Sequence, residues 1–332
     1  MSDDDAERPL KRHKPQHEHQ ETNVTEIERS PDFWFDDGNI VLQAGPTQFR
    51  VAKSMLSRHS SVFRDMFSLP NPTSESTVEG CPVVVLAGDT NTDWKHLLAV
   101  MYPAICYDLT KPNIMTVISV LRLSKKYDLP AFRKESIRRL RGDLPSKLED
   151  FRKLPVAGWL YLGEVSDVQL SRTIALAKEL CLWSILPAAF YGLIESIFNH
   201  DGSYRPVGLS LADEISLLKG YARLTRLNTE APNRAWLEAE SPCVPCDDCL
   251  FRTLCRSRCA SLRSTLQAQQ AGPGAVFSGW DENWSDEFCG PCIKAAKEAY
   301  NDKQLEIWKQ LPSFFGLPDW EELRKMDLDA GE

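Results

Sequence analysis

The chain has 332 residues, 42% of them hydrophobic and 9% aromatic, and it carries a formal net charge of −8. This length and composition predict about two domains with hydrophobic cores, and the acidic balance argues against general binding to nucleic-acid phosphates. No run approaches the roughly 20 apolar residues of a membrane helix, and the charged N-terminus lacks the apolar core of a secretory signal. We therefore expect an intracellular protein without a membrane partner, whose ten cysteines are thiols or metal ligands rather than disulfides.

Residues 1–30 are predicted to form a disordered, charged tail, because they contain too few apolar side chains to build a core. A basic run within this tail, Lys11 to Lys14, is compatible with a nuclear import signal and also with an ordinary solvated segment. The location of the protein, nuclear or cytoplasmic, therefore stays open.

The residues after the tail predict a β-hairpin covered by helices. The apolar run Ile40–Leu42 and the alternating segment Phe49–Val51 flank a turn at Gly45-Pro46. Two short helices follow, and Ser60 or Ser61 is expected to cap the second. Because an isolated hairpin is not stable in water, these helices must cover it. We expect three aromatic side chains to converge beneath one small sheet: Phe49, Phe63 and Phe67.

Residues 81–142 add one predicted strand and several predicted helices. The continuous apolar run Val83–Leu86 is typical of a strand that is covered on both faces. Asn91 or Thr92 is expected to cap a helix with a clear apolar stripe, and Pro112 is expected to open the next helix. A turn and a further helix follow, which Gly142 can end.

This order of elements, and the residues that carry it, resemble a BTB/POZ domain. The segments Phe49–Leu56 and Ser60–Phe67 match the family pattern of a strand ending in Phe-x-Val, followed by Lys-x-x-Leu-x-x-x-Ser-x-x-Phe-x-x-Met-Phe. Ala52 stands where the family usually has histidine. The strand Asp37–Leu42 is also similar to that of BTB proteins from mushroom-type (basidiomycete) fungi. The resemblance covers about residues 33–142.

The resemblance implies a protein–protein interaction module. Such a domain would self-associate as a homodimer or recruit a protein partner, including a cullin-type ubiquitin-ligase scaffold for which it would present substrates. Two features depart from the family. No amphipathic helix is expected before Phe33, although family dimers often use one, and the loop Pro103–Asp108 lacks the apolar-x-Glu signature of many cullin binders.

Residues 143–240 are predicted to form an all-helical extension, because apolar residues recur there at helical spacing. One stripe consists of Leu211, Ile215, Leu218 and Tyr221, and such stripes are expected to face the core. The aromatic-rich segment Ala295–Met326 is expected to dock onto the preceding helices, and the alternative is that it binds a partner.

Residues 241–332 are rich in cysteine and are predicted to hold a structural zinc ion. Cys289 and Cys292 form a Cys-x-x-Cys half-site, and we expect Cys255 and Cys259 to supply the other half, because a following helix would hold that pair rigid. By resemblance, the fungal proteins also place a spaced cysteine pair before a helix with an arginine, here Arg263. An alternative half-site is drawn from three other cysteines: Cys243, Cys246 and Cys249.

Other interpretations of the cysteines remain open, namely spare buried thiols and a redox pair at Cys289 and Cys292. Because arginines lie among the cysteines, the alternative function is a zinc-dependent nuclear or transcriptional regulator that contacts nucleic acid. Asp247 and Asp248 are interleaved with these arginines and argue against it. Three further cysteines sit among apolar neighbours and are expected to be inert core residues: Cys81, Cys106 and Cys181.

The sequence contains no nucleophile elbow, phosphate-binding loop or zinc-protease motif. We therefore expect a binding protein rather than an enzyme. The predicted fold is α+β, with a BTB/POZ domain over residues 31–142, an all-α extension over residues 143–240, and a cysteine-rich, zinc-stabilised region with a C-terminal helix over residues 241–332.

Overall fold

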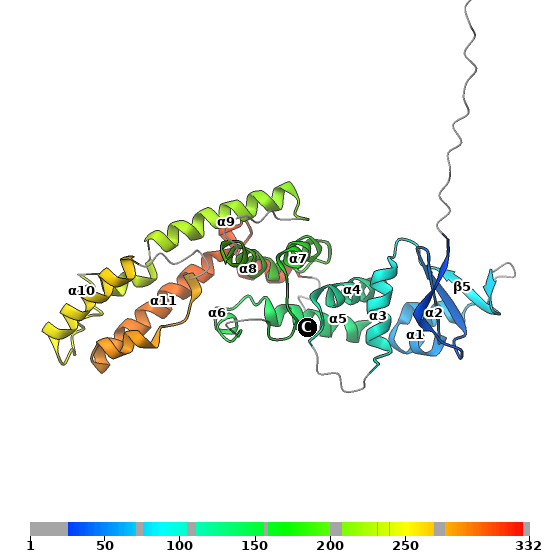
Figure 1. Cartoon of the computed structure of the whole chain (residues 1–332), viewed down its shortest axis with the longest axis horizontal. Coiled ribbons are helices and arrows are strands. Elements are labelled where there is room, and N and C mark those ends of the chain that lie inside the picture. The colour runs from blue at the N-terminus through cyan, green and yellow to red at the C-terminus, as the bar shows by residue number, and fades with distance from the viewer. Residues whose placement is uncertain are drawn as a thin grey trace, which may run out of the picture.

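The structure of the chain, a computed structural model, describes residues 26–70, 76–104, 111–155, 159–199, 208–230, 232–238, 240–268 and 276–327. The basic run Lys11–Lys14 and most of the predicted tail lie outside these residues. The described chain is elongated, with a small sheet at one end, packed helices in the middle and two long helices at the other end (Figure 1).

Five strands form one sheet in the order β1-β3-β2-β5-β4. Their bounds are β1 (Glu28–Trp34), β2 (Ile40–Ala44), β3 (Thr47–Val51), β4 (Thr77–Val78) and β5 (Cys81–Val85). Strands β2 and β3 are the predicted hairpin, and they pair antiparallel around Gly45, whose φ of 55° is readily adopted only by glycine. Because β1 begins at Glu28, the sheet includes three residues that the sequence assigned to the tail.

The predicted strand at Val83–Leu86 forms as β5, but the expectation that both of its faces are covered is wrong. The side chain of Val85 is 66% exposed. β5 lies near the edge of the sheet, and β4 pairs only with Cys81 and Pro82. The face of β5 that carries Val85 is open to solvent at this position.

Five helices accompany the sheet, with bounds α1 (Lys53–His59), α2 (Ser61–Ser68), α3 (Asn91–Met101), α4 (Ile114–Lys126) and α5 (Pro130–Asp143). Ser60 caps α2, because its hydroxyl oxygen accepts a hydrogen bond from the backbone N–H of Phe63. The cap of α3 is Thr90, one residue before the predicted Asn91. Helix α4 begins at Ile114 after its cap Asn113, two residues beyond Pro112, which was expected to open it. Gly142 lies within α5 and does not end it.

The three aromatic side chains predicted to meet beneath the sheet do so. Phe49 and Phe63 are fully buried in one core cluster, and Phe67 packs against it. The ring of Phe63 stacks on that of Tyr127, with 4.8 Å between ring centroids, and meets the indole of Trp94 edge-on. Residues from the hairpin, α2, α3 and the end of α4 therefore share one core.

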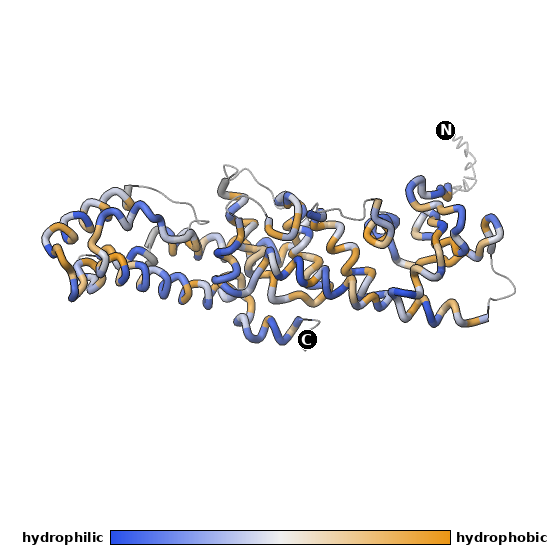
Figure 2. Tube along the Cα trace, turned by 90° about the horizontal axis from the view of Figure 1, so that it is seen from below, coloured by the Kyte–Doolittle hydropathy of each residue, from blue (hydrophilic) through white to orange (hydrophobic). Residues whose placement is uncertain are grey.

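The middle of the chain consists of α6 (Leu148–Phe151), α7 (Asp167–Glu179), the 3-10 helix η1 (Trp183–Ile185), α8 (Leu186–Asn199) and α9 (Leu211–Glu230). These helices pack around a second core cluster, which also contains residues of α4 and α5. In Figure 2, apolar segments gather where the helices of the middle meet. The predicted boundary at residue 143 is therefore crossed by continuous packing.

The prediction that the stripe on α9 faces the core is wrong. Leu211 is 74% exposed and Leu218 is 66% exposed, whereas the neighbouring Leu217 and Leu224 are buried. The buried face also contains Gly220, and any Cβ atom at this position would overlap the ring of Phe315. This close approach to Phe315 requires a glycine, and Gly220 lies on the same face of α9 as the buried Leu217 and Leu224.

The last part of the chain comprises η2 (Pro232–Leu237), α10 (Arg252–Ala268), η4 (Glu282–Glu287), α11 (Gly290–Phe314) and α12 (Trp320–Met326). The prediction that the aromatic C-terminal segment docks onto the preceding helices is confirmed. Trp308, Phe315 and Trp320 are buried in the core of the middle helices. The indole N–H of Trp320 donates to the backbone carbonyl of Trp308 at 2.8 Å. None of the helices in the described part of the chain combines the length and apolar character needed to cross a bilayer.

Candidate functional site

Four cysteines from two separate segments meet at the end of the molecule that lies farthest from the sheet. The thiol sulfurs of Cys249, Cys255, Cys289 and Cys292 all lie within 4.8 Å of one another. Cys255 and Cys292 are buried, Cys289 is 9% exposed and Cys249 is half-buried. The cluster lies where the N-terminal ends of α10 and α11 come together.

The secondary structure explains why these four sulfurs converge. Cys289 is the N-cap residue of α11 and Cys292 lies in its first turn. Cys255 lies in the first turn of α10, and Cys249 precedes that helix in a turn closed by a hydrogen bond from its backbone N–H to the carbonyl of Cys246. Two helix N-termini therefore point at the cluster, and their partial positive charge stabilises thiolates.

The spacing of the sulfurs fits a tetrahedral metal site. With Zn–S bonds of about 2.3 Å, the sulfurs of a four-thiolate site lie about 3.8 Å apart. The sulfurs of Cys249 and Cys289 are 3.8 Å apart. Four thiols, closely packed and largely buried, form the donor set that structural zinc prefers.

Hydrogen bonds prepare one of these thiols for deprotonation. Burial opposes ionisation of Cys289, but the backbone N–H groups of Cys292 and Leu250 lower the pKa of its thiol to about 6. For Cys255 and Cys292, burial raises the pKa. A bound cation would overcome this burial penalty, because metal binding displaces protons from thiols.

The structure brings together three of the four cysteines of the first predicted set, and it places Cys249 instead of Cys259 with them. Cys259 is buried one helical turn beyond Cys255, where its thiol donates to the carbonyl of Leu237 at 3.3 Å and contacts the guanidinium of Arg263. Four residues of α-helix rise about 6 Å. In this structure the sulfur of Cys259 is directed at Leu237 and Arg263, and it is not among the sulfurs that meet at the end of α10.

The alternative half-site named from the sequence is also divided. Cys249 joins the cluster, and Cys246 lies beside it, with 3.6 Å between its sulfur and that of Cys292. Cys243 is half-buried and packs at the edge of the same small core. The sequence does contain a sign that Cys249 binds metal, because Cys246 and Cys249 form a Cys-x-x-Cys pair.

A small aromatic core surrounds the cysteines. The ring of Trp236 in η2 lies 5.0 Å from that of Trp280 and 5.9 Å from that of Trp284, measured between centroids. Tyr300 of α11 packs against Trp280 and Trp284. Its hydroxyl donates a hydrogen bond to the backbone carbonyl of Ser278. This core is separate from that of the middle helices, so the cysteine cluster sits in a packed unit of its own.

The other cysteines have different surroundings. Cys81 is buried, as predicted, and its thiol donates to the carbonyl of Gly38. Cys181 is only partly buried and has a positive φ of 55°. Cys106 lies outside the described residues.

Comparison with known protein families identifies the sheet end of the molecule. The BTB/POZ domain family model matches residues 35–142. This range contains β2 to β5, α1 to α4, and α5 except for its last residue, Asp143. No curated protein matches the chain. Residues 35–142 are therefore a BTB/POZ domain, a protein–protein interaction module that is typically not enzymatic.

Proposed function

We propose that this chain is an intracellular adaptor. Its BTB/POZ domain self-associates or recruits a protein partner, and a structural zinc ion at Cys249, Cys255, Cys289 and Cys292 stabilises the far end of its helical arm. The observation that carries the adaptor proposal is the BTB/POZ domain at residues 35–142. The observation that carries the zinc proposal is the close cluster of four thiols.

The elongated shape supports an adaptor, because it separates two ends that can bind independently (Figure 1). At the cysteine-rich end, Leu250, Phe251 and Leu254 are exposed beside the metal-ligand candidates. Exposed apolar groups of this kind are typical of protein-binding surfaces. The zinc ion would hold this surface in shape, since the ends of α10 and α11 converge on its ligands.

A structural role for the metal is favoured over a catalytic one. All four candidate ligands are thiols, and catalytic zinc sites usually keep one coordination position open for water. Elemental analysis of untagged, purified protein tests the zinc proposal. We expect about one zinc ion per chain, and protein that binds no zinc after purification in zinc-containing buffer would refute it.

Light scattering coupled to size-exclusion chromatography tests self-association. We expect a mass near twice that of the 37.6 kDa chain. A monomer at every concentration would exclude the homodimer, and would leave partner recruitment as the role of the domain. The narrower role of substrate adaptor requires direct binding of a purified cullin N-terminal domain, which calorimetry measures.

We also propose that the chain belongs with the BTB proteins of mushroom-type fungi, on the basis of the strand Asp37–Leu42 and the arginine-bearing helix after the cysteines.

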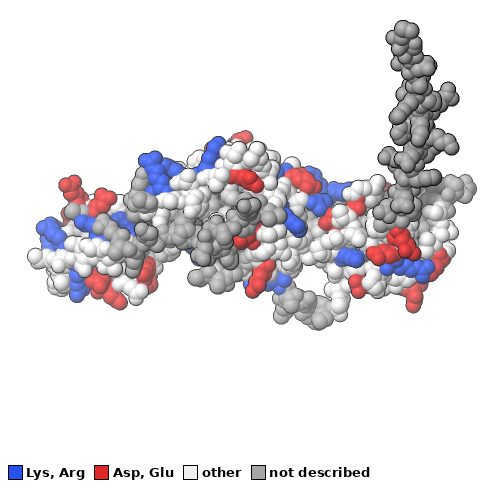
Figure 3. Space-filling view, turned by 45° about the horizontal axis from the view of Figure 1, so that its top comes forward, with Lys and Arg blue, Asp and Glu red and all other residues white. Residues whose placement is uncertain are grey.

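The surface at the cysteine-rich end does not favour the alternative role of a nucleic-acid-binding regulator. Figure 3 shows basic and acidic side chains mixed at that end of the molecule. Nucleic-acid affinity depends on a concentrated basic surface.

A further inference from the structure

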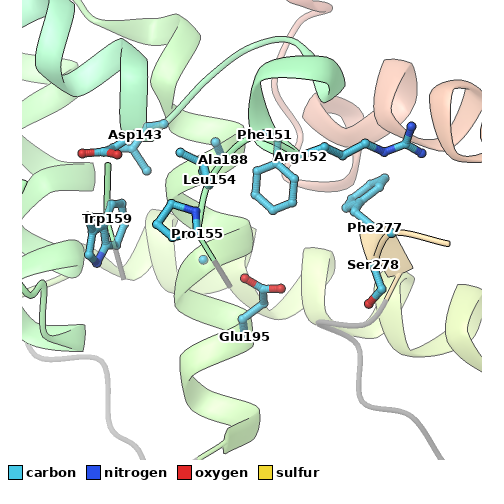
Figure 4. Close-up of a pocket in the computed structure, with 13 residues that line it drawn as sticks. Asp143, Phe151, Arg152, Leu154, Pro155, Trp159, Ala188, Glu195, Phe277 and Ser278 are labelled. Carbon is cyan, nitrogen blue, oxygen red and sulfur yellow. The ribbon is translucent and has the colours of Figure 1, made fainter. Parts of the chain in front are cut away.

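A cavity of about 460 Å³ is lined in part by residues of α6 and α8. Figure 1 shows these helices between the sheet and the cysteine-rich end of the chain. Three residues of α8 border it: Ala188, Gly192 and Glu195. Their spacing of four and three residues places them on one face of the helix. Because Ala188 and Gly192 are small, they leave space beside α8. Figure 4 shows the side chain of Glu195 directed into this space.

Aromatic side chains form much of the remaining wall. Phe151 of α6 and Phe277 lie on one side, with 6.4 Å between their ring centroids, and Trp159 lies on the other (Figure 4). Phe277 is buried, while Pro155 and Ser278 are exposed and lie at the rim. The cavity therefore combines an apolar, aromatic interior with a rim that solvent reaches.

Glu195 borders this cavity and has no ion-pair partner among the described residues. Its carboxylate accepts a hydrogen bond from the hydroxyl of Tyr191, and no described lysine, arginine or histidine pairs with it. Burial raises the pKa of Glu195 to about 7, although the hydrogen bond from Tyr191 lowers it. A half-buried carboxylate without a cation is costly, and a positively charged ligand would remove that cost.

The other charged groups at the cavity are already engaged. The carboxylate of Asp143 accepts hydrogen bonds from three consecutive backbone N–H groups, those of Leu160, Tyr161 and Leu162. The guanidinium of Arg152 donates to the side-chain oxygen of Gln304. Figure 4 shows the guanidinium of Arg152 and the carboxylate of Asp143 directed away from Glu195, so a ligand beside Glu195 would meet the carboxylate of Glu195 first.

We propose that this cavity binds a small organic ammonium ion, with the charged nitrogen at Glu195 and the apolar body against Phe151, Trp159 and Phe277. The volume lies within the range of about 300–1,000 Å³ that is usual for small-molecule sites. Aromatic faces attract cations, and the effect is stronger at a site shielded from water. A carboxylate and aromatic walls together favour a ligand that carries a positive charge on an otherwise apolar molecule.

Isothermal titration calorimetry of the full chain with phenethylamine, at a pH of about 8 where Glu195 is ionised, tests this assignment. We expect saturable binding of one ligand per chain, with a Kd on the order of 0.1–1 mM for a ligand of this size. Phenethyl alcohol has the same shape without the charge, and we expect it to bind at least about tenfold more weakly.

Two variants and a control locate the site. Glu195→Gln should weaken phenethylamine binding at least about tenfold, and Ala188→Leu should weaken it by filling the cavity. The control Glu298→Gln removes the same negative charge from an exposed position on α11, and it should leave binding unchanged. The assignment is overturned if phenethylamine does not bind at about 10 mM, if the alcohol binds equally well, or if folded Glu195→Gln binds the amine like the unaltered chain.

Discussion

Arg141, near the C-terminal end of α5, and Asp327, directly after α12, form an ion pair of 2.9 Å across 186 positions of the chain. The side chain of Asp327 is 1% exposed. It also accepts hydrogen bonds from the backbone N–H and the hydroxyl of Ser184 in η1. One carboxylate therefore ties the last helix of the BTB/POZ domain to the helical extension and to the C-terminal segment.

Replacing Asp327 should destabilise the protein. We expect Asp327→Ala to lower the free energy of unfolding by about 2–4 kcal/mol, because it leaves the buried N–H of Ser184 without an acceptor and removes a buried charge partner. Urea denaturation followed by circular dichroism measures the change. Asp302→Ala, an exposed change on α11, should alter stability by less than about 0.5 kcal/mol. Equal effects of the two variants would contradict a joining role for Asp327.

The cysteine cluster predicts which thiols hold zinc. Cys249→Ser should lose most of the bound zinc, since it removes one of the four converging sulfurs. Cys259→Ser should retain it, because that sulfur lies against Leu237 and Arg263. Elemental analysis of both purified variants checks the difference. The reverse result would restore the set Cys255, Cys259, Cys289 and Cys292.

The half-buried carboxylate of Glu195 predicts a pH dependence of stability. Its pKa in the folded chain is about 7, above the ordinary 4.5, so between these two values the folded state holds the proton more often than the unfolded state does. Stability should therefore fall as the pH rises through this window. Glu195→Gln should remove this contribution, and at a pH of about 8 it should be more stable by up to about 3 kcal/mol. Urea denaturation of both chains at several pH values measures the slope, and identical slopes would refute the prediction.

Two glycines within helices should respond oppositely to alanine. At Gly220, a Cβ atom would overlap the ring of Phe315, so Gly220→Ala should destabilise the protein by about 1–3 kcal/mol. At Gly192, the nearest atom to a Cβ is Cδ2 of Leu170 at 3.5 Å, an ordinary contact. Gly192→Ala should therefore stabilise the protein by about 0.5–1 kcal/mol, since alanine restricts the unfolded chain. Melting temperatures of the two variants should shift in opposite directions.

Adjacent leucines on α9 should differ sharply. Leu217 is 4% exposed and Leu218 is 66% exposed. Leu217→Ala should cost about 2–4 kcal/mol through the cavity that it leaves, and Leu218→Ala should change stability by less than about 0.5 kcal/mol. Denaturation curves of the two variants test the orientation of α9. A larger loss for Leu218→Ala would show that the opposite face of this helix is buried.

Much of the BTB/POZ domain could be predicted from residues close together in the chain. The hairpin follows from the alternation around Phe49 and from the turn at Gly45, and the cap of α2 follows from Ser60. These features depend on backbone geometry and on hydrogen bonds between near neighbours. The sequence could not reveal that β5 is open to solvent at Val85, because that depends on which elements pack over this face of the sheet.

The cysteine-rich region shows where local spacing is insufficient. Cys289 and Cys292 could be paired from their spacing, because a helix N-terminus brings residues three apart to one point. Their partners could not be chosen, since several cysteine pairs in the other segment have similar spacing. The choice between Cys249 and Cys259 depends on how α10 meets α11, with one helical turn separating Cys259 from the point of convergence.

The primary structure thus determines the type and order of the elements at the sheet end, the helical character of the extension, and a thiol-rich segment that can bind metal. The three-dimensional packing decides which face of α9 is buried, which sulfurs converge, and where Glu195 is enclosed without a counter-ion. The physical reason is that secondary structure depends on interactions over a few residues. Contacts such as Gly220 with Phe315, or Cys249 with Cys289, depend instead on the best packing of whole helices.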